Sequence, residues 1–284
     1  MQNAFAHCEA LVRAADKDRF LATLYAPAEH RAALYALYAF NVEVARVREV
    51  AREPLAGEIR LQWWSDALDG TGRGEIEANP VAAALLATIA RYGLQRDALQ
   101  ALLEARRFDL YDEPMTTLAA LDDYGEGVSS GLIALAARVL AGGEESGIDA
   151  LVRHAGLAQA ITGLLKAFPI HAARGQLYVP LEVLERHGAG EQDVRGGSAT
   201  AQLRAALADM RRAARRHLDA ARPLLATQAP AVMPALLPVA LAAPMLARME
   251  RPDYDPFVPV ELAPWRHPWL IWRAARRPAR MLGS

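Results

Sequence analysis

The sequence predicts an all-α fold in a single domain. Alanine and leucine recur at helical spacing along nearly the whole chain, whereas the alternating β-branched runs typical of strands are almost absent. Proline, asparagine and glycine stand where helices begin and end. With 284 residues, 53% of them hydrophobic, the chain can bury one large core. No linker divides it, so residues 1–284 are treated as one domain.

The first predicted helices begin at prolines. Pro27 opens a helix over 27–50, because the first amide of a helix needs no partner. Asn79 is a capping residue, and Pro80 leads into a helix over 81–92. Both starts follow the ordinary preferences of helix N-termini.

Thr117 caps the next helix, which runs to residue 140 and ends before Gly142 and Gly143. A polar, glycine-containing loop is expected at 188–197. Further helices are predicted at 57–68, 95–110, 144–171, 200–225 and 267–277.

The segment 229–247 carries no charge and nearly reaches the length that spans a bilayer. Its prolines would repeatedly interrupt the hydrogen bonds of a spanning helix. They are Pro230, Pro234, Pro238 and Pro244. We therefore expect a kinked helix buried in the core.

Composition excludes several classes of protein. The formal net charge is −1, so no overall field attracts nucleic acid, and no nucleic-acid partner is expected. Cys8 is the only cysteine, which rules out an internal disulfide and a cysteine-built metal site. His7, Glu9 and Arg13 interrupt the N-terminus where a signal peptide would be apolar. We expect a cytoplasmic protein.

Two predicted helices are apolar on two sides. In 27–50, the stripes are Leu37, Phe40, Val44 and Val47, and then Tyr38, Val42, Ala45 and Glu49. In 144–171, they are Leu157, Ile161, Leu164 and Phe168, and then Ala160, Gly163, Ala167 and His171. A helix that is apolar on two sides is buried on both. The second stripe of each faces either a cavity or another helix, and the sequence leaves both open.

Several strings spread over residues 18–275 resemble the motifs of one enzyme family. They are Leu34-Tyr-Ala-Leu-Tyr-Ala-Phe40, Phe108-Asp109-Leu110, Tyr124, Gly156-Leu-Ala158 and Arg174-Gly-Gln-Leu-Tyr-Val-Pro180. In this order they are similar to motifs of the squalene/phytoene synthase family. The resemblance implies an isoprenoid (terpenoid) synthase-like helical bundle around a central cavity.

The resemblance also implies where that family's catalytic groups would fall. Those enzymes join two prenyl diphosphates head to head, and paired aspartates on two facing helices hold Mg²⁺, which prefers oxygen ligands. Their polar positions correspond here to Val42, Ala45, Glu49, Ala160, Gly163, Ala167 and His171. Only Glu49 keeps a carboxylate, so we expect no metal site and no cofactor. Mg²⁺ would enter only if the chain were an active enzyme.

The candidate site follows from the same mapping. The cavity-lining candidates are Tyr38, Asn41, Val42, Ala45, Ala160, Gly163, Ala167, Arg174 and Tyr178. Arg174 and Tyr178 either hold an anionic head group or pin the loop that follows the long helix. Glu49, Glu126 and His171 are the candidates for any residual catalysis. Asp122 and Glu126 otherwise belong to a solvated helical face.

Where this chain differs from the enzymes of that family, it resembles one branch of the family, the complex I assembly factors. The matching strings are Tyr38–Glu43, Gln62-Trp63-Trp64, the set Tyr124, Glu126, Ser129 and Ser130, the ending Asp253–Pro259, and Trp272-Arg273. This implies a catalytically inactive protein with complex I subunits or assembly intermediates as partners and a prenyl or lipid chain as ligand. The alternatives are an active head-to-head prenyl transferase with substitute carboxylates, and a plain lipid-binding module.

The sequence also contains two basic stretches. The first contains Arg211, Arg212, Arg215 and Arg216; the second interleaves Trp265, Trp269 and Trp272 with Arg266, Arg273, Arg276, Arg277 and Arg280. We expect solvated arginines and tryptophans docked on the core. The alternative is peripheral contact with the inner face of a membrane, where tryptophan and arginine both anchor.

Overall fold

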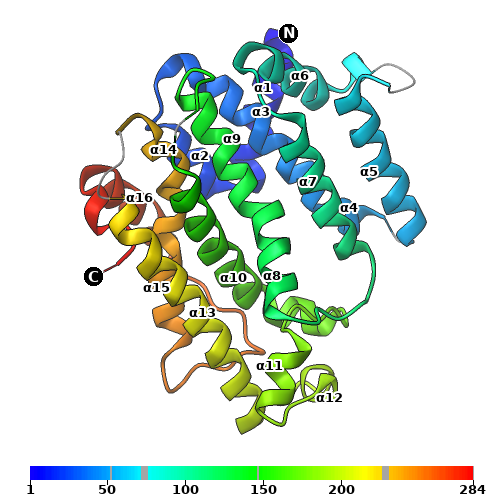
Figure 1. Ribbon diagram of the computed structural model, residues 1–284, viewed down its shortest axis with the longest axis vertical. Coiled ribbons are helices and arrows are strands. Elements are labelled where there is room, and N and C mark those ends of the chain that lie inside the picture. The colour runs from blue at the N-terminus through cyan, green and yellow to red at the C-terminus, as the bar shows by residue number, and fades with distance from the viewer. Residues whose placement is uncertain (52, 72–75, 146, 226–229, 284) are drawn as a thin grey trace.

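The computed structural model describes residues 1–51, 53–71, 76–145, 147–225 and 230–283. Every regular element within these ranges is helical (Figure 1). The α-helices are α1 (Gln2–Ala15), α2 (Lys17–Thr23), α3 (Ala28–Ala45), α4 (Val47–Val50), α5 (Pro54–Asp69), α6 (Pro80–Tyr92), α7 (Arg96–Arg107), α8 (Leu118–Gly125), α9 (Gly131–Leu140), α10 (Asp149–Ala173), α11 (Leu181–Arg186), α12 (Glu191–Arg195), α13 (Ala201–Leu225), α14 (Met233–Leu236), α15 (Ala242–Met249) and α16 (Arg266–Arg276). Shorter turns are η1 (Ile76–Ala78), η2 (Phe108–Leu110), η3 (Glu126–Ser130), η4 (Pro230–Val232), η5 (Leu237–Leu241) and η6 (Pro278–Arg280).

The predicted helix caps are confirmed. The Asn79 side chain accepts hydrogen bonds from the amides of Val81 and Ala82, at 2.9 and 3.0 Å. Thr117 accepts from the amide of Ala120 at 3.1 Å. These contacts satisfy amides that have no partner within the helix.

Several boundaries differ from the expectation. The helix over 27–50 breaks at Arg46 into α3 and α4. The helix over 117–140 contains η3, a π-helical turn between α8 and α9. Helix α10 begins only at Asp149, because Gly147 before it has a left-handed φ of 63°. Part of the expected loop at 188–197 forms α12, and α1 and α2 were not among the predicted helices.

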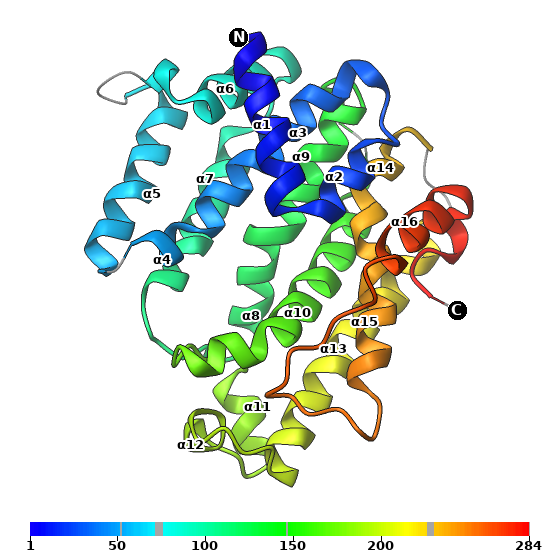
Figure 2. The same cartoon turned by 180° about the vertical axis from the view of Figure 1, so that it is seen from behind.

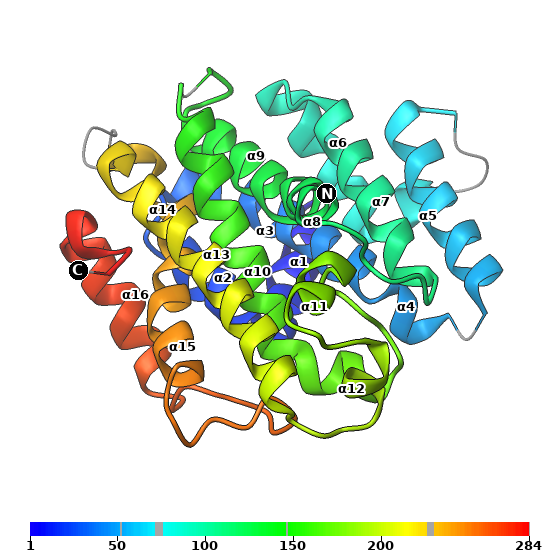
Figure 3. The same ribbon diagram turned by 60° about the horizontal axis from the view of Figure 1, so that its bottom comes forward.

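The core is one contiguous cluster of buried side chains. Helix α3 supplies Leu34, Leu37 and Phe40, all fully buried, and the Phe40 ring meets Trp64 of α5 edge-on at 5.0 Å. Helix α10 runs through the middle of the bundle, against α13 on one side and η3 on another (Figures 2 and 3). The two helices with double apolar stripes are thus the central ones.

Among the described residues, one stretch is long and apolar enough to cross a membrane, Pro230–Met249, with a mean hydropathy of 1.8. In its most apolar window, 72% of the residues are buried inside the molecule. Its prolines divide it into η4, α14, η5 and α15. The expected kinked core segment is confirmed, except that its first residue, Ala229, lies outside the described residues.

Candidate functional site

A central pocket of about 360 Å³ opens between α4, η2, η3 and the second half of α10. It brings together most of the residues that the sequence assigned to the cavity. Those that line it are Ala45, Glu49, Ala160, Gly163, His171, Arg174 and Tyr178. Part of each second stripe therefore faces this cavity: Ala45 and Glu49 from one stripe, and Ala160, Gly163 and His171 from the other.

Other predicted residues lie elsewhere. Tyr38 is buried, with the Arg19 guanidinium 5.6 Å from its ring centre. Asn41 is also buried, and its side-chain oxygen has no hydrogen-bond partner in the described structure. Ala167 is half-buried on α10 without lining the pocket. Val42 lines a separate cavity of about 630 Å³ beside Trp63 and Trp64.

The floor of the pocket is a hydrogen-bonded cluster around Asp109, defined here as the Asp109 cluster. The carboxylate accepts from the hydroxyls of Tyr178 and Tyr124, at 2.6 and 2.9 Å, and from Arg106 at 2.9 Å. Burial raises the pKa of both tyrosines, with the negative charge of Asp109 adding to the rise, so both hydroxyls stay protonated. The floor is thus held in one arrangement by charge-assisted hydrogen bonds.

His171 stands beside this cluster on α10. Its ring lies 4.5 Å from the ring of Tyr178, centre to centre. Burial lowers the pKa of His171 to about 4, against the partial opposition of Asp109 and with the help of Arg174 and Arg106. At neutral pH the imidazole is therefore uncharged.

Arginines outnumber carboxylates among the residues that line the pocket. Four guanidinium groups line the pocket, from Arg19, Arg48, Arg106 and Arg174, against the carboxylates of Glu49 and Asp109. Arg19 pairs with Asp16 at 2.6 Å and Arg48 with Asp112 at 3.3 Å, whereas Arg174 approaches Glu49 only to 3.7 Å. Arginines arranged in this way suit an anionic group such as a phosphate.

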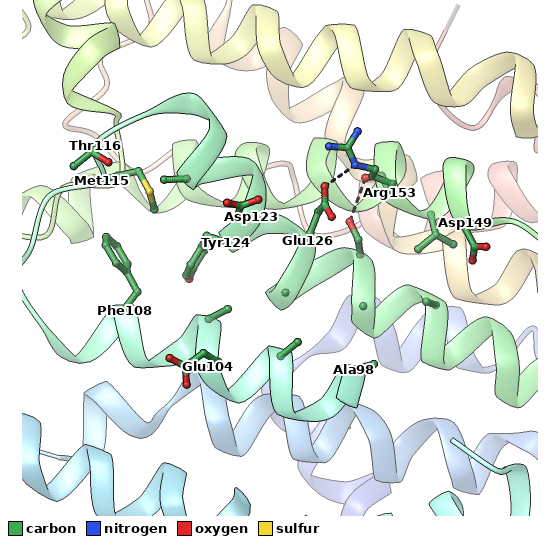
Figure 4. A pocket seen from close by; sticks show the side chains of 18 of the residues that line it. Ala98, Glu104, Phe108, Met115, Thr116, Asp123, Tyr124, Glu126, Asp149 and Arg153 are labelled. Atoms are coloured by element: carbon green, nitrogen blue, oxygen red, sulfur yellow. Dashed lines mark hydrogen bonds and ion pairs between the residues drawn. The ribbon is translucent and has the colours of Figure 1, made fainter. Parts of the chain in front are cut away.

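A second cavity, the outer groove, lies between α7 and the α8–η3–α9 segment and measures about 900 Å³ (Figure 4). Small residues line its base: Ala98, Ala101, Ala105, Gly127, Gly131 and Ala134. Glu126 lies on this groove, not on the pocket, and pairs with Arg153 at 2.5 Å (Figure 4). Tyr124 lines both cavities.

The family follows from a comparison with known proteins. The family model described as squalene/phytoene synthase matches residues 12–273. The chain belongs to the squalene/phytoene synthase family. The matched range contains the central pocket, the strings that resembled this family and most of the helical bundle.

Two kinds of relative are similar within the family. The chain is 29% identical over 253 residues to the NADH dehydrogenase (ubiquinone) complex I assembly factor 6 of Homo sapiens, covering 89% of this chain and 76% of that protein. The Drosophila melanogaster homolog is 32% identical over 259 residues, covering 87% and 76%. A presqualene diphosphate synthase of Sinorhizobium fredii is 29% identical over 192 residues, covering 67% of each chain.

Solved structures of family members have the same fold. A dehydrosqualene synthase superimposes with a TM-score of 0.81 at 19% identity, covering 97% of this chain and 96% of the other. The squalene synthase HpnC from Alicyclobacillus acidocaldarius gives 0.77 at 24% identity, covering 90% and 96%. The predicted isoprenoid synthase fold is confirmed.

The residues of the pocket do not fit the Mg²⁺ of squalene and phytoene synthases. Ala45, Ala160 and Gly163 offer no side-chain ligand. Asp109 already accepts three hydrogen bonds, one of them from a guanidinium. Glu49 lies near Arg46 and Arg174, at 3.8 and 3.7 Å. Within the described residues, no group of three histidine, cysteine or acidic side chains is placed to hold a metal ion.

Sequence reasoning missed three of the four arginines of the pocket. Arg19, Arg48 and Arg106 come from α2, α4 and α7, so only the tertiary fold brings them together. A local signal existed for two pairs. Arg19 follows Asp16, and Asp109 follows Arg106, by the three residues that place two side chains on one helical face.

Proposed function

We propose that this chain is a non-catalytic member of the squalene/phytoene synthase family that supports assembly of respiratory complex I. The observation that carries the proposal is the state of the central pocket. Of its positions for metal ligands only Glu49 keeps a carboxylate, and the others are alanine, glycine and a neutral histidine, while the fold around the pocket is that of the family. The similarity to complex I assembly factor 6 over 89% of the chain supports the same conclusion.

The chemistry of diphosphate ionisation supports the non-catalytic part. A leaving diphosphate carries several negative charges, and Mg²⁺ neutralises them while fixing their geometry. Here guanidinium groups supply the positive charge instead. They can bind an anionic group, but Ala45, Ala160 and Gly163 leave no side-chain ligand to position two diphosphates against each other.

The positive pocket supports a binding role within the same proposal. A phosphate or diphosphate head group of a prenyl chain or lipid would meet Arg19, Arg106 and Arg174 without any metal ion. Val128 and Leu164 offer apolar contact in the same pocket. The expected ligand is therefore an anionic lipid or prenyl phosphate that binds without Mg²⁺.

The enzyme alternative is favoured by the similarity to a presqualene diphosphate synthase. It requires substitute carboxylates, namely Glu43, Glu49, Asp109 or Glu126. Glu43 lies with Val42 in a separate cavity and Glu126 lies on the outer groove, so of these four acids Glu49 and Asp109 share the central pocket. Asp109 already accepts three hydrogen bonds, and Glu49 lies near two arginines, so neither carboxylate is free to share an ion.

Deletion of the gene in its own organism tests the assembly role. We expect a loss of NADH:quinone activity and of intact complex I in isolated membranes, with succinate oxidation unchanged as the control. Carotenoid and hopanoid levels, measured in the same cells, should not change. Intact complex I together with the loss of a terpenoid would overturn the proposal in favour of the enzyme.

A direct assay tests the catalytic part. Purified protein with farnesyl or geranylgeranyl diphosphate and Mg²⁺ or Mn²⁺ should release no pyrophosphate. The same diphosphates should raise the melting temperature equally with Mg²⁺ and with a chelator, since ligand binding stabilises by mass action. Metal-dependent formation of a C30 or C40 product contradicts the proposal.

A further inference from the structure

Helix α16 has a buried face and a face of exposed aromatic side chains. Leu270, Ile271 and Ala274 are only 2%, 1% and 2% exposed and pack the helix onto η5 and α2. The tryptophan face, defined as Trp265, Trp269 and Trp272, is 67%, 42% and 47% exposed. The expectation that these tryptophans dock on the core is therefore wrong.

We propose that the tryptophan face of α16 binds the surface of a bilayer that contains anionic lipids. The three rings follow a spacing of four and three residues, so they share one side of the helix. Large apolar side chains gathered on a surface mark an interaction site. Tryptophan in particular prefers the boundary between head groups and acyl chains, where its ring is buried and its N–H stays wet.

The charges around the face fit an anionic bilayer. Residues 262–283 contain five arginines and no acidic residue: Arg266, Arg273, Arg276, Arg277 and Arg280. The guanidinium carbon of Arg273 lies 4.8 Å from the centre of the Trp269 ring, and that of Arg276 lies 5.9 Å from the Trp272 ring. Each pair would place its cation at the level of lipid phosphates when the ring enters the interface.

Among the described residues, Asp18 is an acidic group that contacts α16, and its contact is compatible with this orientation of the helix. Asp18 of α2 lies 2.7 Å from His267, and this pair attaches the helix to the body of the protein. Both side chains are half-buried. The contact fixes α16 in place while the tryptophan face stays outside.

The shape of the region favours a bilayer over other partners. Helix α16 lies at an outer edge of the molecule (Figures 1 and 3). None of its tryptophans lines any of the cavities described above. Single-stranded nucleic acid is usually held in a basic groove that tracks its backbone. Helix α16 lies at an edge with its rings on the outer side, so it offers no groove for a nucleic acid strand. The same arrangement matches a flat surface.

Vesicle flotation of the full-length protein tests the proposal. We expect flotation with vesicles of phosphatidylcholine mixed with phosphatidylglycerol, little with phosphatidylcholine alone, and a decrease as salt is raised. Tryptophan emission should shift to the blue, and lipids brominated on their acyl chains should quench it. Equal binding to neutral vesicles, or binding without quenching, overturns the proposal.

Matched variants locate the surface. Trp265→Ser/Trp269→Ser/Trp272→Ser should weaken vesicle binding at least about tenfold and abolish the quenching. The control Val50→Ser/Leu55→Ser/Ile59→Ser removes three other exposed apolar side chains, on α4 and α5. It should bind as the wild type does, since α5 and α16 lie at opposite edges of the molecule (Figure 3).

A charge-reversal pair completes the test. Arg273→Glu/Arg276→Glu should bind anionic vesicles more weakly and lose the salt dependence. Arg60→Glu/Arg96→Glu, with the same charge change at exposed positions on α5 and α7, should not. Equal losses in both pairs would mean that net charge, not α16, drives binding. Tighter binding of single-stranded nucleic acid through the same tryptophans would replace the bilayer with another partner.

Discussion

The two halves of α10 use glycine in opposite ways. A Cβ atom at Gly156 would lie 2.2 Å from the hydroxyl oxygen of Ser130 and 2.5 Å from its Cα, so this half of α10 packs directly onto η3. A Cβ atom at Gly163, two turns later, would meet nothing within 4 Å. The same residue type marks a close contact between backbones at one position and open space at the other.

This difference separates a packed half of α10 from a half that lines the central pocket. Ala45, Ala160 and Gly163 line the central pocket, and the space beside Gly163 is open. A cavity in a protein interior normally costs stability, because its lining loses contacts. The open half of α10 therefore lines a cavity, while the closed half is packed as protein interiors normally are.

Among variants at the pocket beside the open half of α10, breaking the Asp109 cluster should reduce the free energy of unfolding the most. Asp109→Ala leaves the Arg106 guanidinium buried and unpaired, and we expect a loss of about 3–5 kcal/mol in the free energy of unfolding. Urea denaturation measures it. Asp112→Ala, which removes the exposed partner of Arg48, should cost less than about 1 kcal/mol. Similar losses in both variants would mean that the cluster is not a rigid floor.

The closed half should tolerate no added atom. Gly156→Ala forces its methyl group against the backbone of Ser130, which cannot move without shifting η3. We expect a destabilisation of about 3 kcal/mol, at the upper end of overpacking effects. Thermal and urea unfolding measure it. An unchanged melting temperature would show that η3 yields easily.

The pH dependence of stability should distinguish His171. Its folded pKa of about 4 lies below the ordinary value of 6.5, so the unfolded chain takes up a proton in this window and the folded chain does not. Stability is therefore lost as pH falls from about 6.5 to about 4. Between these pH values, the free energy of unfolding of wild type should fall further than that of His171→Gln, by up to about 2 kcal/mol. Identical pH profiles would contradict the placement of the ring.

The smallest effect should come from filling the open half. Gly163→Ala adds a methyl group where no atom lies within 4 Å, inside a helix that alanine favours. We expect a gain of about 0.5–1 kcal/mol in unfolding free energy. A loss would mean that the space is closed in solution. Gly156→Ala is the matched control on the same helix.

Much of the fold could be predicted from local patterns. Asn79 and Thr117 cap helices as expected, because capping depends only on neighbours in sequence. The break at Arg46 and the π turn at 126–130 could not be predicted, since tertiary packing decides them. Val42 shows the limit of periodicity. It lies about 60° around the helix from Ala45, which is enough to face another cavity.

The tryptophan face shows a different limit. Trp265, Trp269 and Trp272 share one side of α16, whereas Leu270, Ile271 and Ala274 share another. Periodicity identifies two apolar stripes but does not say which one enters the core. In the structure the smaller aliphatic residues do so, packed against η5 and α2.

The π turn at 126–130 sets the phase of one helix relative to the next. Val128 and Ser129 face the central pocket, while Gly127 and Ser130 face the outer groove. Winding the same residues as a continuous α-helix, with none removed, would rotate all of α9 by about 100° against α8. Such a change cannot occur gradually, because every side chain from Gly131 to Leu140 would change its neighbours at once. Redesign of either cavity must therefore treat α8 and α9 as two helices of independent register.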